Sequence, residues 1–185
     1  MFRHLSTVFG LLTILTLACG SNLLSAKPTP PHGPIVVSEA AADQLKQNAY
    51  QALEEATTSN EAQLRFNNEQ VTSLVALELT RTGQIPITNP QIWFTPNQIH
   101  LAGVASGLGP IDADVYITAH LNLQDGKIIM AVDEAKLGAF DFPETTLVSL
   151  TQTVNEALAN AAWEIAITQV QIVEGEMIVT GKRQP

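Results

Sequence analysis

The side chains that could carry out chemistry in this sequence are few and scattered. Asp112 and Asp114 are two residues apart, so on a strand their carboxylates would share one face and could bind a cation or exchange a proton. A solvated strand face explains the same spacing more simply. His100 and His120 fall on expected strands, where surface or cross-strand contacts explain them better than metal ligation. Ser106 stands one position too late between its two glycines to be the nucleophile of a G-x-S-x-G elbow.

Recognisable catalytic patterns are missing from the chain. It holds no H-E-x-x-H motif and no Walker-type phosphate loop, and it has no second cysteine that could complete a metal site. We therefore expect a protein that is not an enzyme and that uses no cofactor and no metal.

Composition limits the kinds of partner. Apolar residues make up 45% of the 185 residues and charged residues 15%, which is typical of a folded domain with a core. The formal net charge of −9 counts against nucleic acid, because phosphate binding needs clustered Lys and Arg. It also counts against electrostatic attachment to anionic lipid. Membrane contact would then need apolar surface or a covalent anchor.

The N-terminal part of the chain is predicted to export and anchor the protein. The mostly apolar run from Leu5 to Ala18 is short for a membrane span and is typical of a signal-peptide core. Cys19, the only cysteine, stands where bacterial lipoprotein signals carry the residue that becomes acylated. We expect residues 1–18 to be a signal peptide, residues 19–36 to be a lipidated cysteine with a Pro-rich tether, and residues 37–185 to be one domain.

Acylation of Cys19, for example with palmitate, would hold the protein on the extracytoplasmic side of a membrane of the bacterial cell envelope. Two or more acyl chains, at about 0.8 kcal/mol per buried CH₂, are enough for stable anchoring. The alternative is an ordinary secretory signal with an incidental cysteine. The prolines between Lys27 and Pro34 favour an extended spacer, in which His32 is expected to be solvated.

A long hairpin is the centre of the predicted domain. Apolar residues hold every second position from Ile111 to Leu123, which predicts a long strand with one apolar face. Asp125-Gly126 is a typical two-residue hairpin turn, and residues 127–132 are expected to return as a second strand that ends before Asp133-Glu134.

Helices and further strands are expected to cover the apolar face of this hairpin. Apolar residues at helical spacing predict helices over 38–57, 67–83 and 144–163, the last being the longest. Alternating residues predict strands over 62–66, 165–173 and 177–180 and a second hairpin over 91–103. This order predicts an α+β fold with a mostly antiparallel sheet.

Five segments together resemble a known family. They are Phe66-Asn-Asn-Glu-Gln-Val-Thr-Ser-Leu74, the hairpin Ile92–Gly103, the turn Gln124-Asp-Gly-Lys127, the segment Lys136-Leu-Gly-Ala-Phe-Asp-Phe-Pro143 and the terminal strand Met177-Ile-Val-Thr-Gly-Lys182. In this order they are similar to small bacterial proteins of the tubular lipid-binding (TULIP-like) superfamily, close to the LmeA-like phospholipid-binding family. The resemblance implies one long, curved, mostly antiparallel sheet wrapped around one or more amphipathic helices. In a chain of this size, this would form a half-tube with lipid tails in an apolar seam.

The expected seam lies between the central strands and the helix over 144–163. Small residues on the inner sheet face, such as Ala119 and Ala131, leave volume that either a closely packed helix or a ligand must fill. The residues expected to line the seam are Phe94, Leu101, Val115, Ile117, Ala119, Leu121, Ala131, Leu147, Leu150, Val154 and Leu158.

These features predict an envelope lipoprotein that binds or transfers hydrophobic ligands such as phospholipid-like acyl chains. A surface-tethered structural or protein-interaction module with a closed core and no ligand is the main alternative. A hydrolase whose residues are not recognisable is a third.

Overall fold

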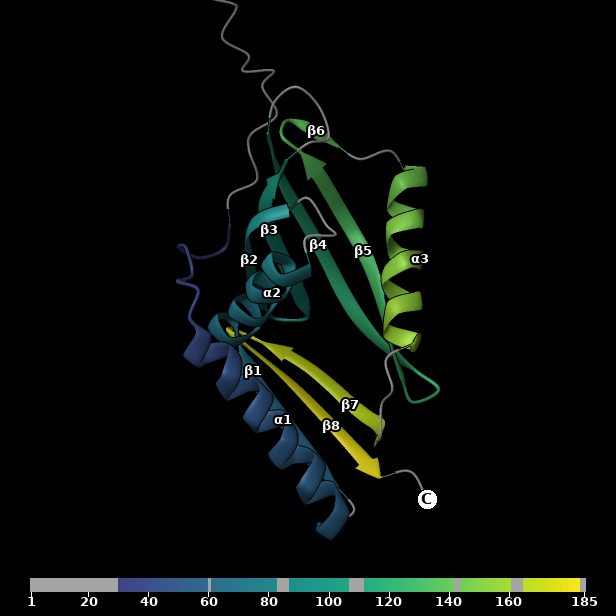
Figure 1. Cartoon of the computed structure of the whole chain (residues 1–185). Helices are drawn as coiled ribbons and strands as arrows, with labels where there is room; N and C mark the ends of the chain where they lie inside the picture. The colour runs from purple at the N-terminus through teal and green to yellow at the C-terminus, as the bar shows by residue number, and fades with distance from the viewer. Residues whose placement is uncertain are drawn as a thin grey trace, which may run out of the picture.

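The computed structural model describes residues 30–59, 61–82, 87–106, 112–141, 144–160 and 165–183. Within these ranges the chain forms three helices and eight strands (Figure 1). In chain order they are α1 (Glu39–Ser59), β1 (Ala62–Asn67), α2 (Asn68–Thr82), β2 (Ile87–Thr95), β3 (Gln98–Ala105), β4 (Ala113–Gln124), β5 (Lys127–Leu137), β6 (Phe140–Asp141), α3 (Glu144–Asn160), β7 (Ile165–Val173) and β8 (Glu176–Arg183). The predicted α+β class with antiparallel strands is confirmed.

The strands form two sheets rather than the single curved sheet that was expected. One sheet has the order β2-β3-β4-β5-β6 and the other has the order β1-β8-β7, with antiparallel pairing throughout. In Figure 1 helix α3 lies beside β5. In the chain, α3 follows β6 and precedes the β7–β8 hairpin. Because α3 covers the edge of β5, β7 cannot continue the first sheet. It pairs with β8 instead, and β8 pairs with β1.

The central hairpin forms at the predicted turn. Asp125 (φ 51°) and Gly126 (φ 74°) both adopt left-handed backbone angles, as a tight hairpin with two central residues requires. The returning strand is longer than expected, because it continues through Asp133 and Glu134 to Leu137. The ladder shifts register at that point, since Thr118 pairs with Glu134 while Ala119 pairs with Val132. Asp133 is the additional residue of this β-bulge.

Two helix starts follow from their capping residues. The Ala41 N–H donates to the Ser38 hydroxyl (3.3 Å) at the start of α1. At the start of α2, the Gln70 N–H donates to the Asn67 side chain (2.9 Å) and the Asn67 N–H donates to the Gln70 side chain (3.0 Å), which is a reciprocal capping box.

The longest described helix is α1, with 21 residues, and not α3, which has 17. Helix α1 extends past the predicted stop at Thr57. The hydroxyls of Thr57 and Ser59 donate to main-chain carbonyls of Glu54 (2.6 Å) and Glu55 (2.8 Å), so they bond back within the helix instead of ending it.

Helix α2 covers the β2 edge of the five-stranded sheet and forms hydrogen bonds with its backbone. The Ile92 N–H donates to the Thr72 hydroxyl (2.9 Å), and this hydroxyl lies 3.2 Å from the Ile92 carbonyl oxygen, to which it donates. The Phe94 N–H donates to the side-chain oxygen of Asn68 (2.9 Å). Side chains thus satisfy backbone groups of an edge strand that would otherwise be open to another chain.

Helix α3 likewise covers part of β5 and forms side-chain hydrogen bonds with the backbone of that strand. The Asn155 carboxamide accepts from the Met130 N–H (2.8 Å) and donates to the Met130 carbonyl (2.8 Å), and the Val132 N–H donates to the Thr151 hydroxyl (3.4 Å). The helix was expected to face the central strands across a seam, and its described hydrogen bonds are with the backbone of β5. Its polar residues at i and i+4 turn toward the strand backbone and hold it along the edge.

The segment before α1 is packed on the sheet, although residues up to 36 were expected to form a free tether. The Gln91 side chain accepts from the Ile35 N–H (2.6 Å) and donates to the Ile35 carbonyl (3.2 Å). The Trp93 indole donates to the Gly33 carbonyl (3.2 Å), and His32 contacts Glu174 (2.5 Å). The packed part of the chain thus begins before residue 37, because main-chain groups of residues 33–35 find partners on β2. Residues 1–29, with the expected signal peptide and Cys19, lie outside the described residues.

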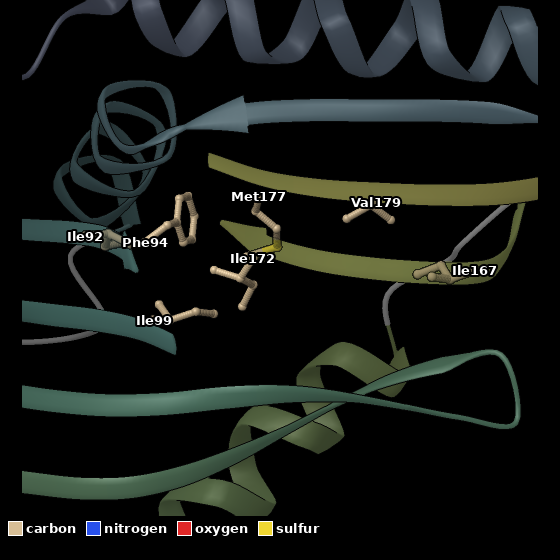
Figure 2. Close-up of a cluster of buried hydrophobic side chains, with 7 residues drawn as sticks. All are labelled: Ile92, Phe94, Ile99, Ile167, Ile172, Met177 and Val179. Carbon is tan, nitrogen blue, oxygen red and sulfur yellow. The ribbon is translucent and has the colours of Figure 1, made fainter. Parts of the chain in front are cut away.

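A hydrophobic core joins the two sheets at one end. Figure 2 shows its buried side chains in the space between the β7–β8 hairpin and strands β2 and β3. They are Ile92, Phe94, Ile99, Ile167, Ile172, Met177 and Val179. Main-chain hydrogen bonds tie the hairpins together at this end, from the Asn97 N–H to the Ile172 carbonyl (3.0 Å) and from the Gly175 N–H to the Phe94 carbonyl (3.0 Å).

Candidate functional site

A cavity of about 630 Å³ continues from this core and is partly open to the surface. Its walls come from both sheets and from helices α1 and α2. All the described side chains that line it are apolar: Ala49, Ala52, Leu53, Leu64, Phe66, Val71, Val75, Ile92, Phe94, Ile99, Leu101, Leu121, Ile128, Met130, Met177 and Val179. Such a lining, at a volume within the usual range of ligand sites, suits an apolar guest.

Strand pairing explains how distant residues meet in this lining. In the three-stranded sheet, Leu64 pairs with Val179 and Phe66 pairs with Met177. Each such pair points to one face, because side chains alternate along a strand and directly paired residues share a face. In the five-stranded sheet, Phe94 pairs with Ile99, and Leu121 pairs with Met130. The two apolar faces therefore bound one space.

The interior of the cavity is not filled by protein side chains. Leu101, Leu121, Ile128 and Met130 lie on central strands and are apolar, yet each is only half-buried. At about 24 cal/mol per Å³, a closed and empty cavity of about 630 Å³ would cost on the order of 15 kcal/mol. That is as large as the whole stability of a typical domain, about 5–15 kcal/mol. This cavity is partly open, so water can enter it, and an apolar guest would instead remove its apolar lining from water.

The expected seam residues are only partly brought together. Phe94, Leu101 and Leu121 line the cavity. Ile117 and Ala119 pair with Leu101 and Ile99, so they share the face of the sheet that borders the cavity but lie outside its lining. Val115 is also outside this lining and borders a different cavity.

The expected residues of β5 and α3 lie elsewhere. Ala131 is paired with His120 and faces away from the cavity, because Met130 is the partner of Leu121. Leu147 is half-buried on α3 and is not part of the lining, since this helix runs along the sheet edge. The side chains of Leu150, Val154 and Leu158 are outside the described part of the structure.

The sequence contained a signal for some of the lining residues that were missed. A turn at Asp125-Gly126 pairs Gln124 with Lys127, so counting back pairs Leu121 with Met130 and not with Ala131. The wall formed by α1, with Ala49 and Leu53, was visible as an apolar stripe, but the stripe alone does not say whether it packs or borders a cavity.

None of the described histidines and acidic residues lines the cavity. Asp133 bonds to His120 across the β4–β5 ladder (2.7 Å), as expected for a cross-strand residue. Asp112 is exposed, and Asp114 lines the second cavity, about 480 Å³ in volume, between the sheet and residues 30–35. Among the described residues, no group of three or more His, Cys, Asp or Glu side chains could hold a metal ion.

His100 is the centre of a row of polar side chains on the outer face of the sheet. Its Nε2 lies 2.8 Å from the Thr95 hydroxyl and its Nδ1 lies 2.9 Å from the Tyr116 hydroxyl. Burial, helped by His32, lowers the pKa of His100 below its usual value, although Glu174 acts in the opposite direction. Burial also raises the pKa of Tyr116. The row links β2, β3 and β4.

This environment predicts a pH effect on stability. When the pH falls through the ordinary histidine range near 6.5, the unfolded chain takes up a proton at His100 before the folded chain does, so folding becomes less favourable. The melting temperature of the wild type is expected to fall more between pH 7.5 and pH 5.5 than that of His100→Gln. Thermal unfolding followed by circular dichroism would measure both slopes, and equal slopes would contradict the assignment.

Comparison with known proteins leaves the cavity as the main guide to function. No family model matches the chain, and no curated protein matches its sequence. None of the described helices is long and apolar enough to cross a membrane.

Proposed function

We propose that this protein is an exported lipoprotein of the cell envelope that binds and passes on hydrophobic molecules with phospholipid-like acyl chains. The observation that carries the proposal is the cavity of about 630 Å³ whose described lining is wholly apolar. Binding would be driven by removing the ligand's CH₂ groups from water, at about 0.8 kcal/mol for each group. No covalent chemistry is part of the proposed activity.

The proposed fold type is a half-tube related to the tubular lipid-binding proteins. The apolar space that the antiparallel strands enclose together with α1 and α2 supports this likeness, whereas the division of the strands into two sheets departs from it. The sheets meet at the core of Figure 2, and the space beside that core is where the acyl chain would lie.

Native mass spectrometry of the purified protein tests the proposal. The full chain should carry Cys19→Ala, so that a covalently attached acyl chain is not mistaken for a bound one. We expect a population with added mass that organic extraction removes and identifies as lipid. A clean unliganded mass, together with no uptake from phosphatidylcholine vesicles, would contradict the proposal and favour a surface-tethered module without a ligand.

The membrane anchor is a separate prediction. Replacing Cys19 with alanine is expected to move the protein from the membrane fraction to the soluble fraction, because the acyl chains that would hold it are lost. Immunoblots of fractionated cells would measure the distribution, with Ser21→Ala as the control. An unchanged membrane fraction for Cys19→Ala would show that another feature attaches the protein.

A further inference from the structure

The volume of the apolar cavity limits the amount of hydrocarbon that it can hold. A dry protein cavity of about 150 Å³ accommodates one benzene molecule, which has six carbon atoms. By the same ratio, a cavity of about 630 Å³ accommodates roughly 25 non-hydrogen atoms. One common membrane acyl chain has roughly 16 to 18 carbon atoms, and the two chains of a diacyl lipid have about twice as many. The cavity therefore has space for one chain and not for two.

The character of the lining determines which end of a ligand enters. None of the described lining residues carries a polar side chain, so a head group inside would lose its hydration without gaining a hydrogen-bonding side chain. The polar end must then remain at the opening, in contact with water.

Hydrogen bonds between the elements that form the cavity walls oppose a widening of the cavity for a second chain. The side with α2 is held to β2 by the buried Thr72 hydroxyl, and the start of α1 is held to α2 because the Ser38 N–H donates to the Ser73 hydroxyl (3.0 Å). Widening the cavity would require these contacts to break.

We propose that the ligand class is a single-chain amphiphile, such as a fatty acid, a monoacylglycerol or a lysophospholipid, bound with its chain inside and its polar end at the opening. This inference rests on the proposed function and specifies its ligand. A diacyl lipid would insert one chain and leave the other outside, so its second chain would add little to binding.

Displacement of cis-parinaric acid, a fluorescent fatty acid whose chain carries no polar group, from the purified protein tests this inference. Saturated fatty acids of increasing length would be compared first, and then 1-palmitoyl-lysophosphatidylcholine with dipalmitoyl-phosphatidylcholine. Each CH₂ that enters the cavity is expected to tighten binding by about fourfold. The gain should stop at about 25 carbon atoms, where the cavity of about 630 Å³ is full.

The outcomes separate the inference from the proposed function. A break in the length series, with the lysophospholipid and the diacyl lipid binding within about threefold of each other, would support a single-chain site. Continued tightening well beyond about 25 carbon atoms, or a diacyl lipid bound more than tenfold tighter than its lysophospholipid, would overturn the single-chain inference while keeping lipid binding. Failure to bind the fluorescent fatty acid would overturn the proposed function and the inference together.

Discussion

Replacing Ala49 with tryptophan is expected to weaken acyl-chain binding by an order of magnitude or more while leaving the protein folded. Ala49 lies on α1, is half-buried and lines the cavity, so an indole ring at this position would occupy space that the ligand needs. Excluding as few as two CH₂ groups would cost about 1.6 kcal/mol, roughly fifteenfold in affinity. Displacement of the fluorescent fatty acid would measure the loss.

A matched substitution on the same helix is the control for this prediction. Ala40 lies in the first turn of α1 and is exposed, so Ala40→Trp adds the same side chain without entering the cavity. It should bind the fatty acid as the wild type does. The Ala49 variant should unfold at the same denaturant concentration as the wild type, or at a higher one, because filling a cavity removes part of its cost. Unchanged binding in Ala49→Trp, or a loss of stability like that of an overpacked core, would mean that the space beside Ala49 is not a ligand site.

Replacing Thr72 with valine is expected to destabilise the protein by about 2–4 kcal/mol, the largest loss that we expect from removing one polar atom. Thr72 has no exposed surface, and its hydroxyl bonds to both the N–H and the carbonyl of Ile92. Valine has nearly the same shape, but it leaves these two backbone groups without a partner beside the cavity wall. Urea unfolding at neutral pH would measure the change.

Two further variants distinguish the hydrogen bonds from other effects of the substitution. Thr72→Ser keeps the hydroxyl and should recover most of the lost stability. Thr58→Val removes an exposed hydroxyl that donates to the Glu55 carbonyl (3.1 Å) and should change stability by no more than about 0.5 kcal/mol. If Thr72→Val were as mild as Thr58→Val, α2 would not be held to β2 through this hydroxyl.

Local features of the chain could be predicted from neighbouring residues. The positive backbone angles of Asp125 and Gly126 make the central turn, and the side chains of Ser38 and of Asn67 with Gln70 begin two helices. These features depend on atoms a few residues apart, so the amino-acid order is sufficient to specify them. The alternation of apolar residues along β4 likewise predicted the strand, although Thr118 on its polar face is buried and Leu123 on its apolar face is exposed.

The division into two sheets depended on contacts between distant segments. Periodicity indicates that α3 has an apolar side, but it does not say which strand the helix contacts. Asn155 and Thr151 hold it along β5 through backbone groups that are more than fifteen residues away in the chain. With that edge occupied, β7 and β8 formed a separate sheet with β1.

The candidate site was likewise predictable from the sequence only in part. The amino-acid order alone specified that Phe94, Leu101 and Leu121 point inward, because alternation and turn length set the facing of each strand. It could not specify that α1, α2 and the β1–β8 pair would form the opposite wall, nor that the walls would stand far enough apart to leave a cavity. Hydrophobic attraction has no direction and acts between any apolar faces, so the choice of partner is made only when all the elements pack together.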